Sequence, residues 1–401
     1  MNLRQVLRDA LQQLTAAQVP SASTTAEVLL MHVLERDRTF LYAYPEAELS
    51  VEQERAYRHL LRQRAAGHPT QYLTCRQEFW GLPFHVEPGV FIPRPETEHV
   101  VEVALQIVRE RMSKADARIV DVGTGTGCIA LALAKDLPSA HITAVDVSED
   151  ALRLARHNAE ALGLAPRVQF LHSDLLEVFT SHGLAPNGVE GSEAEGSGAE
   201  GSGVEGSRAC PERSRGITNH ESRPFDLIVS NPPYVSPDQA AQLPREVREH
   251  EPPAALFSPG DGLEVTRRLI GQAAILLAPS ASSDFPEALV GRGFSPAEKG
   301  QRQSGALAPE EEKPQRLKPE VFGGANVRAK ALTYQTQAVG GPALRSLPAQ
   351  AGSQSVGGWL VLELGYNMAA RARSLLGDAW TNIEITNDLR GIPRVLAAQR
   401  K

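Results

Sequence analysis

Residues 118–136 read RIVDVGTGTGCIALALAKD, and this stretch decides the fold. An apolar, β-branched run ends at Val122, and an apolar helix-like run fills the second half of the stretch. Between the two runs stand three alternate glycines: Gly123, Gly125 and Gly127. This order predicts a buried strand that turns directly into a helix. Because glycine has no Cβ, the backbone of such a turn can approach a bound molecule closely, so we expect a ligand above it.

Strand-like and helix-like patterns keep alternating around this stretch. The predicted strands are 118–122, 141–146, 168–172, 225–230 and 359–364, and the predicted helices are 97–111, 128–136, 151–162, 262–277 and 368–376. Such alternation is typical of an α/β fold with a parallel, doubly wound sheet. Two further predicted strands, 383–387 and 394–398, lie too close together for a helical crossover. They predict an antiparallel hairpin at one edge of the sheet.

The rest of the chain divides by composition. Residues 1–70 carry apolar helical faces and predict a small helical domain, while the aromatic, Pro- and Gly-rich residues 71–96 predict a structured connector to a main domain over 97–401. Residues 182–223 repeat Glu-Gly-Ser, and residues 280–355 are rich in Pro, Gly, Ser and charge. We expect both to be disordered insertions, with an added folded module as the alternative for the second. Each follows a helix and precedes a strand, which predicts that it leaves from the sheet edge opposite the ligands.

Composition sets the broad class. The 401 residues, 42% of them hydrophobic, can build more than one core. No run approaches the roughly 18 apolar residues of a membrane span and no signal peptide is visible, so we expect a cytoplasmic protein without a membrane partner. A net charge of −7 gives no general attraction to nucleic acid. Three dispersed cysteines favour neither a disulfide framework nor a zinc site.

Acidic residues follow the next two predicted strands. Asp146 ends one strand, where its carboxylate can accept hydrogen bonds from both hydroxyls of a ribose. Asp174 lies just past the other strand, where it can accept from an adenine amino group while Leu175 covers the ring. The loop spacing is GxGxG rather than GxGxxG, which favours S-adenosylmethionine over NAD. A tight turn with an acidic helix cap is the purely structural alternative, and Asp174 alone is equally good as a turn residue.

The most informative tetrapeptide is Asn231-Pro232-Pro233-Tyr234, which follows the predicted strand 225–230. Its prolines stiffen the loop and remove two backbone donors. The Asn231 side-chain oxygen and the Pro232 carbonyl can accept the two N–H bonds of a planar amide or amino group, and Tyr234 can pack on its plane. The tetrapeptide therefore indicates methyl transfer to a planar nitrogen by orientation and desolvation, without a strong base. A plain proline turn is the alternative.

Further segments carry a family resemblance. They are RAAGHP at 64–69, EFWG at 78–81, FIPRPETE at 91–98, and Glu251-Pro252 with Gly260-Asp261-Gly262. Together with the two motifs above, they make the chain similar to the HemK-like release factor glutamine methyltransferases outside the two insertions. The resemblance implies a Rossmann-like class I S-adenosylmethionine methyltransferase sheet with an antiparallel edge hairpin, after a helical substrate-recognition domain. It also implies methylation of the glutamine amide (N5) in the Gly-Gly-Gln motif of class I peptide chain release factors.

The resemblance assigns roles to individual residues. Those expected at the cofactor are Gly123, Thr124, Gly125, Thr126, Gly127, Asp146, Asp174, Leu175 and Asn231. Those expected at the substrate are Asn231, Pro232, Pro233 and Tyr234, of which Asn231, Pro232 and Tyr234 are the catalytic candidates. Arg94, Glu96 and Glu98 are expected at the site entrance, with helix capping as the alternative for the two glutamates. Cys75 departs from the family, which usually has glycine there.

Other functions stay open beside this resemblance. A ribosomal-protein glutamine methyltransferase is the nearest, although the segment 93–98 favours release factors. An adenine N6-methyltransferase would need a target-reading domain or a basic surface, and the chain shows neither. An inactive protein that only binds release factor is the alternative outside enzymes. We expect a monomer with no metal and no stable nucleic-acid partner.

Overall fold

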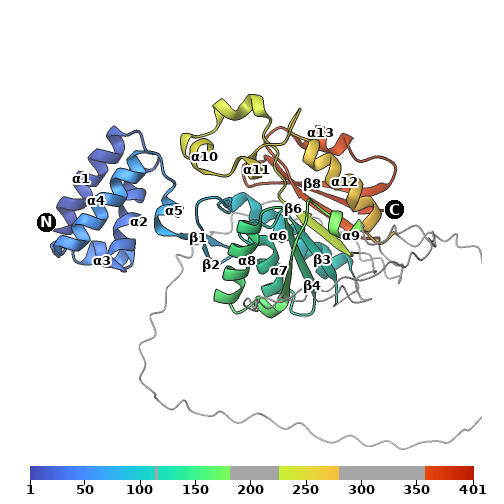
Figure 1. Ribbon diagram of the computed structural model, residues 1–401, viewed down its shortest axis with the longest axis horizontal. Helices are drawn as coiled ribbons and strands as arrows, with labels where there is room; N and C mark the ends of the chain where they lie inside the picture. The colour runs from blue at the N-terminus through green and yellow to red at the C-terminus, as the bar shows by residue number, and fades with distance from the viewer. Residues whose placement is uncertain (113–115, 181–224, 280–356) are drawn as a thin grey trace, which may run out of the picture. The chain divides into compact units, whose positions relative to one another are not determined.

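The computed structural model describes residues 1–112, 116–180, 225–279 and 357–401 (Figure 1). The insertions predicted at 182–223 and 280–355 lie outside these ranges, and so does Cys210. No helix in the described ranges has the length and apolar character that crossing a membrane requires.

Five helices form the N-terminal part. They are α1 (Leu3–Ala16), α2 (Ala22–Leu34), α3 (Arg38–Ala43), α4 (Val51–Ala65) and α5 (Thr70–Thr74). Asn2 and Ser50 cap α1 and α4, and in each case the glutamine three residues on completes a capping box. The apolar stripes of α1, α2 and α4 meet around Leu14, Leu29 and Tyr57, which are fully buried. The Tyr57 hydroxyl donates to the Ala26 carbonyl at 2.9 Å, so this polar atom is satisfied inside the core.

A short hairpin follows these helices. It consists of β1 (Arg76–Phe79) and β2 (Leu82–His85), which pair antiparallel through a turn at Trp80 and Gly81. Cys75 ends α5 with φ +53°, in the left-handed region that favours glycine. The family's usual glycine at this position thus has a conformational reason, and Cys75 occupies the same backbone shape at some cost.

The main sheet has seven strands in the order β5-β4-β3-β6-β7-β9-β8. Their bounds are β3 Arg118–Val122, β4 His141–Asp146, β5 Val168–His172, β6 Leu227–Ser230, β7 Trp359–Glu363, β8 Trp380–Asn387 and β9 Pro393–Arg400. The first five strands of that order run parallel, and β9 and β8 are antiparallel at the edge, so the predicted α/β fold class and edge hairpin are confirmed. The prediction 383–387 was too short for β8, because a register shift between Thr381 and Glu384 breaks the alternation of side chains there.

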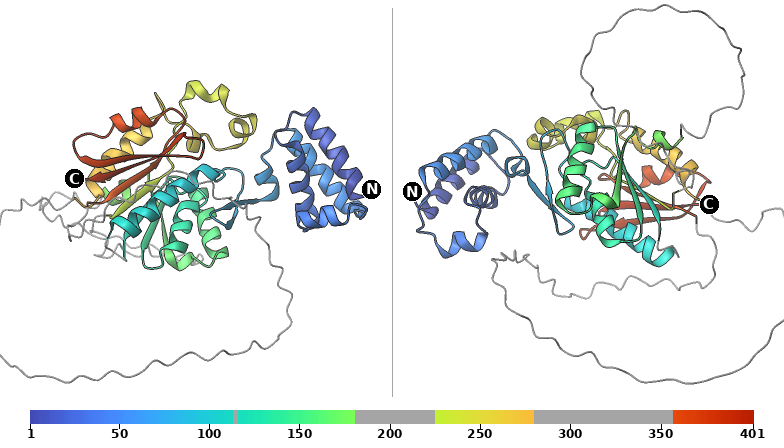
Figure 2. Two further views of the ribbon diagram at one scale, coloured as in Figure 1. Left: turned by 180° about the vertical axis from the view of Figure 1, so that it is seen from behind. Right: turned by 60° about the horizontal axis from the view of Figure 1, so that its bottom comes forward.

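Helices cover both faces of this sheet (Figures 1 and 2). The α-helices after the hairpin are α6 Glu98–Gln106, α7 Cys128–Asp136, α8 Glu149–Ala161, α9 Glu177–Thr180, α10 Arg245–His250, α11 Pro253–Leu256, α12 Glu264–Leu276 and α13 Ala369–Ser374. A π-helical turn, Ile107–Arg111, continues α6, and the 3₁₀ turns are η1 Pro95–Thr97, η3 Ala165–Arg167 and η5 Pro237–Gln242. The predicted helix 97–111 is therefore present, but it changes from α to π hydrogen bonding at Ile107.

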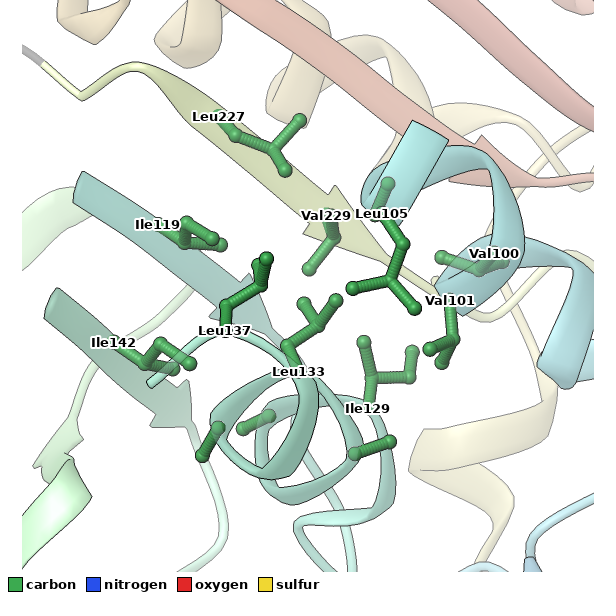
Figure 3. Packing of buried hydrophobic residues seen from close by; sticks show 14 of the residues in the cluster. Val100, Val101, Leu105, Ile119, Ile129, Leu133, Leu137, Ile142, Leu227 and Val229 are labelled. Carbon is green, nitrogen blue, oxygen red and sulfur yellow. The ribbon is translucent and has the colours of Figure 1, made fainter. Parts of the chain in front are cut away.

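Successive residues of the central strands point to opposite faces, and both faces are buried. Ile119, Leu227 and Val229 face α6 and α7, where Figure 3 shows them against Leu105 and Leu133. Their neighbours Val120 and Ile228 belong to the cluster that includes α12 and α13. This two-sided burial explains why these strands read as continuous apolar runs rather than alternating ones.

The described residues that follow the two longer gaps, 181–224 and 280–356, lie at the amino edge of the sheet. Phe225 precedes β6 and donates its N–H to the Leu276 carbonyl at 2.8 Å, while Gly358 precedes β7 and donates to the Ala278 carbonyl at 2.7 Å. Ala278 in turn donates to the Phe225 carbonyl at 3.1 Å. The described residues that flank the gaps are thus tied together opposite the carboxyl ends of β3 and β6.

Candidate active site

The carboxyl ends of the parallel strands open onto one cavity of about 450 Å³. Most of the residues singled out in the sequence line it: Arg94, Gly123, Thr124, Gly125, Thr126, Asp146, Asp174, Leu175, Asn231, Pro233 and Tyr234. The structure places Gly127, Pro232 and Glu96 outside this lining. Residues from the two separate motifs of the sequence therefore face one shared space, as expected at the carboxyl edge of a doubly wound sheet.

The three loop glycines differ in what surrounds them. All have positive φ, at +71° for Gly123, +57° for Gly125 and +83° for Gly127. A Cβ on Gly127 would lie 3.1 Å from Leu131 and 3.2 Å from Ala155, whereas one on Gly123 or Gly125 would meet no protein atom within 4 Å. Gly127 thus serves the packing of α7 against α8, and the other two leave open space above the loop for a ligand.

Asp121, which the sequence reasoning left out of the site, holds the loop in place. It is fully buried at the end of β3 and accepts from the Thr124 hydroxyl at 2.7 Å and from the Ala130 N–H at 3.2 Å. Burial raises its pKa to about 7, although these two hydrogen bonds oppose the rise. A carboxylate within an apolar strand, directly before the glycines, was the signal that could have found it.

Asp146 connects the end of β4 to the glycine loop. Its two carboxylate oxygens accept from the N–H groups of Gly125 and Ser148, each at 2.9 Å. Burial raises the pKa of Asp146, and the backbone hydrogen bonds act in the opposite direction. Because each carboxylate oxygen can accept more than one hydrogen bond, both retain capacity for the hydroxyls of a ribose.

Asp174 and Leu175 lie just past β5 at the side of the cavity. Arg268 of α12 pairs with Asp174 at 2.7 Å and with Glu177 at 3.1 Å, a contact between distant segments that the sequence did not indicate. Leu175 has φ +51°, in the left-handed region, and lines the cavity beside Asp174. The carboxylate expected to meet an adenine amino group is therefore also the partner of an arginine.

Asn231 directly follows the end of β6 and lines the cavity. Its Nδ2 donates to the Thr97 hydroxyl oxygen at 3.1 Å. Its Oδ1 accepts no hydrogen bond from the part of the chain that the structure describes. The amide oxygen thus remains available as an acceptor, which is the feature that the sequence reasoning required of this residue.

Tyr234 is fixed by contacts on two sides. Its hydroxyl donates to Glu363 Oε1 at 3.4 Å, and its ring lies so close to Gly365 that a Cβ there would approach within 2.6 Å. Burial raises the pKa of the Tyr234 hydroxyl, so it is neutral near pH 7. The backbone after it is tied down by Val235, which donates to the Leu256 carbonyl at 3.0 Å.

Arg94 also lines the cavity and forms an ion pair with the buried Glu251. Glu251 additionally accepts from the Ile92 N–H at 3.4 Å, and burial raises its pKa while Arg94 opposes the rise. The guanidinium lies 4.8 Å from the centroid of the Phe91 ring. The two segments 91–98 and 251–252, distant in the sequence, therefore meet through this pair.

The two glutamates near Arg94 differ from it in position. Glu96 is exposed on η1, and Glu98 accepts from the Trp80 N–H at 2.8 Å, which ties the β1–β2 turn to the start of α6. Neither lines the cavity. Glu98 is thus a structural residue at this junction.

The sheet order, the glycine loop after β3, the acidic end of β4 and the Asn231–Tyr234 loop define a class I S-adenosylmethionine methyltransferase. The PrmC N-terminal domain model matches residues 5–74, and a methyltransferase domain model matches residues 113–190. The chain belongs to the release factor glutamine methyltransferase family, since a relative of that name from Koribacter versatilis is 31% identical over 400 residues, which cover 100% of this chain and 99% of the relative.

Other relatives of the same name agree. One from Moorella thermoacetica is 38% identical over 280 residues, or 70% of this chain and 83% of the relative. One from Deinococcus radiodurans is 36% identical over 282 residues, or 70% of this chain and 84% of the relative. The resemblance stated from the sequence motifs is therefore confirmed.

Proposed function

We propose that this chain transfers the methyl group of S-adenosylmethionine to the side-chain nitrogen N5 of the glutamine in the Gly-Gly-Gln motif of class I peptide chain release factors. The observation that carries the proposal is the orientation of Asn231, whose nitrogen is engaged by Thr97 while its oxygen remains free to accept. Because that oxygen shares a cavity with the glycine loop, a bound amide and a bound methyl donor can meet there.

The residues of the glycine loop fit the methyl donor. The open space above Gly123 and Gly125 lets a ligand lie directly against the backbone of the loop. The Asp146 carboxylate can still accept hydrogen bonds from the hydroxyls of a ribose. Thr124 and Thr126 line the same space, and Leu175 supplies an apolar wall for an adenine ring beside Asp174. S-adenosylmethionine supplies an electrophilic methyl group on a sulfonium when bound.

The residues after β6 fit the acceptor. An amide nitrogen is a poor nucleophile because its lone pair is delocalised, so its orientation decides the rate. The Asn231 oxygen and the Pro232 carbonyl accept its two N–H bonds, Pro233 and Tyr234 hold its plane, and Arg94 lies at the entrance, with Glu96 exposed nearby. The proton leaves after methyl transfer, when the nitrogen has become acidic, so no strong base is required.

An acceptor panel tests which macromolecule is modified. The purified chain is incubated with labelled S-adenosylmethionine and, separately, with a class I release factor, a ribosomal protein preparation and an adenine-containing oligonucleotide. We expect label in the release factor alone. Label in the ribosomal protein or the oligonucleotide would instead select one of the alternative methyltransferases, and binding of release factor without label would select the inactive binding protein.

The family match at residues 5–74 supports a release-factor-recognising role for the helical domain 1–70, ahead of the connector 71–96 and the methyltransferase domain 97–401. A monomer in the cytoplasm, without a stable nucleic-acid partner, completes the proposal. Because the described residues flanking the two gaps lie at the amino edge of the sheet, removal of residues 183–222 and 281–354 is expected to leave methyl transfer unchanged. The measurement compares the turnover of the shortened and full chains; loss of turnover in a folded, shortened chain would contradict it.

A further inference from the structure

Two buried polar residues contact the Asn231–Tyr234 loop. Thr97, at the end of η1, is 2% exposed, and Glu363, at the end of β7, is 4% exposed. The Thr97 hydroxyl oxygen accepts from Asn231 Nδ2 at 3.1 Å, and Glu363 Oε1 accepts from the Tyr234 hydroxyl at 3.4 Å. Both ends of the Asn231–Tyr234 loop are thus connected to this pair.

Glu363 is the unusual residue of this pair, because burying a carboxyl group costs folding free energy unless the group is paired or hydrogen-bonded. Its Oε2 makes no hydrogen bond of ordinary geometry within the described ranges of the chain. The Thr97 hydroxyl is nevertheless near enough for hydrogen bonding to hold down the pKa of Glu363. Glu363 Oε2 therefore retains acceptor capacity, while Oε1 accepts from Tyr234.

The direction of these hydrogen bonds follows from the chemistry of the groups. An ionised carboxylate only accepts, so it requires the proton of the Thr97 hydroxyl to point toward it. The Thr97 oxygen is then left to accept from Asn231 Nδ2, as observed. That contact in turn fixes the Asn231 amide with its oxygen toward the cavity. A protonated Glu363 can instead donate to the Thr97 oxygen. The Thr97 hydroxyl could then donate to the Asn231 amide oxygen, so the Asn231 amide would no longer be held in one orientation.

We propose that Glu363, acting through Thr97, is a positioning residue that fixes the amide orientation of Asn231 and so sets the acceptor for the substrate N–H. This rests on the proposed function, because it concerns how the acceptor amide is held. Glu363 does not line the cavity. The ionised carboxyl is the form that imposes the working orientation.

The charges around Glu363 set the pH at which this orientation holds. Burial raises its pKa to about 7; Glu96 on η1 adds to the rise, while Arg394 on β9 and the hydroxyls of Thr97 and Tyr234 oppose it. Arg394 itself pairs with Asp388 at 2.9 Å. As the pH falls through about 7, Glu363 takes up a proton and the bias on Asn231 is lost, so turnover should decline on the acid side of that value.

Two pairs of variants test the proposal on the full chain with release factor as substrate. Thr97→Val keeps the shape but removes the hydroxyl, and we expect kcat to fall about tenfold or more with cofactor Kd unchanged. Thr97→Ser keeps the hydroxyl and should restore most of the turnover. Glu363→Gln offers both a donor and an acceptor, so we expect about a tenfold lower kcat at pH 8 and no acid-side decline. Thr266→Val, at a buried threonine of α12 outside the cavity lining, is the matched control.

The melting temperature of the Glu363→Gln variant distinguishes a positioning role of Glu363 from a purely structural one. Because Glu363→Gln removes a buried charge at pH 8, its melting temperature should equal or exceed that of the wild type while its turnover falls. The proposal is overturned if Thr97→Val turns over like the wild type, or if Glu363→Gln keeps the wild-type acid-side decline. Absence of methyl transfer by the wild type itself would instead contradict the proposed function, so the two failures are distinguishable.

Discussion

The cavity has two halves that are built in different ways. The cofactor half, comprising Gly123–Thr126, Asp146, Asp174 and Leu175, comes from one continuous stretch of the chain. The substrate half, comprising Arg94, Asn231–Tyr234 and their buried partners Thr97, Glu251 and Glu363, is assembled from segments far apart in the sequence. The first half is set by backbone conformation next to a strand end, and the second by side chains that meet only in the folded protein.

The two halves share an energetic cost. The cofactor half contains Asp121 and Asp146, and the substrate half contains Glu251 and Glu363; burial raises the pKa of all four carboxyl groups. Buried carboxyl groups add little stability, because the cost of desolvation offsets the attraction to their partners. We infer that both halves are arranged for orientation at the expense of stability.

The largest expected effect separates the two halves at Asn231. Asn231→Ala removes the acceptor for the substrate amide, so we expect turnover to fall roughly a thousandfold, because orientation carries the rate. Cofactor affinity should change by no more than about threefold, since the cofactor half is intact. Turnover is measured by label transfer and affinity by calorimetry. Equal losses in both would mean that Asn231 serves the cofactor alone.

The reciprocal change acts on the cofactor half. Gly125→Val places a β-branched side chain at φ +57° and fills the space above the loop, so we expect cofactor affinity about a hundredfold weaker. Gly271→Ala is the control, because Gly271 lies within α12 and a Cβ there meets nothing within 4 Å. Calorimetric titration with S-adenosylmethionine measures the affinity of both variants. Equal affinities would contradict the assignment of the glycine loop to the cofactor site.

A smaller effect is expected where the substrate half depends on a distant ion pair. Arg94→Ala leaves the buried Glu251 without its charged partner, which should lower the free energy of unfolding by about 2 kcal/mol. Arg153→Ala breaks a pair with Glu87 in which Arg153 is 59% exposed, and it should cost less, because water screens an exposed ion pair. Urea denaturation compares the two variants. A larger loss for Arg153→Ala would show that burial does not distinguish these pairs.

The smallest expected effect is on the pH dependence of stability. Burial raises the pKa of Asp121 and of Glu363 to about 7 in the folded protein, from ordinary values of 3.8 and 4.5. Between those limits the folded state binds more protons than the unfolded state, so these groups make stability fall as the pH rises toward 8. We expect roughly 1 kcal/mol from each of the two groups between pH 6 and pH 8, measured by urea denaturation. An Asp121→Asn or Glu363→Gln variant with an undiminished slope would contradict it.

Sequence reasoning reached the sheet and the cofactor half because their determinants are local. Strand periodicity and the glycine spacing lie within residues 118–172, and the bounds of the strands β3, β4 and β5 and of the helix α7 agree with the predicted ranges. Asp121 was missed because it occupies a position that otherwise reads as buried strand. Gly127 was expected at the cofactor, but its small size is required by Leu131 and Ala155.

The substrate half was only partly accessible to the same reasoning. Asn231–Tyr234 is a compact motif and could be found from the sequence. Thr97 and Glu363 could not, because they contact this motif only after folding brings η1 and β7 next to it. The same holds for Arg268, which pairs with Asp174 across distant segments. Glu98 was expected at the entrance, although its partner is the Trp80 N–H of the hairpin turn. Long-range side-chain pairing leaves no periodic signal in a single sequence.

The position of the transferred methyl group tests the central claim most directly. After reaction of the full chain with S-adenosylmethionine and a class I release factor, fragment-ion mass spectrometry locates the added methyl group. The account predicts a single methyl group on the side-chain nitrogen of the Gly-Gly-Gln glutamine, and none when that glutamine is replaced. Methylation at another residue, or label that persists after the replacement, would contradict it.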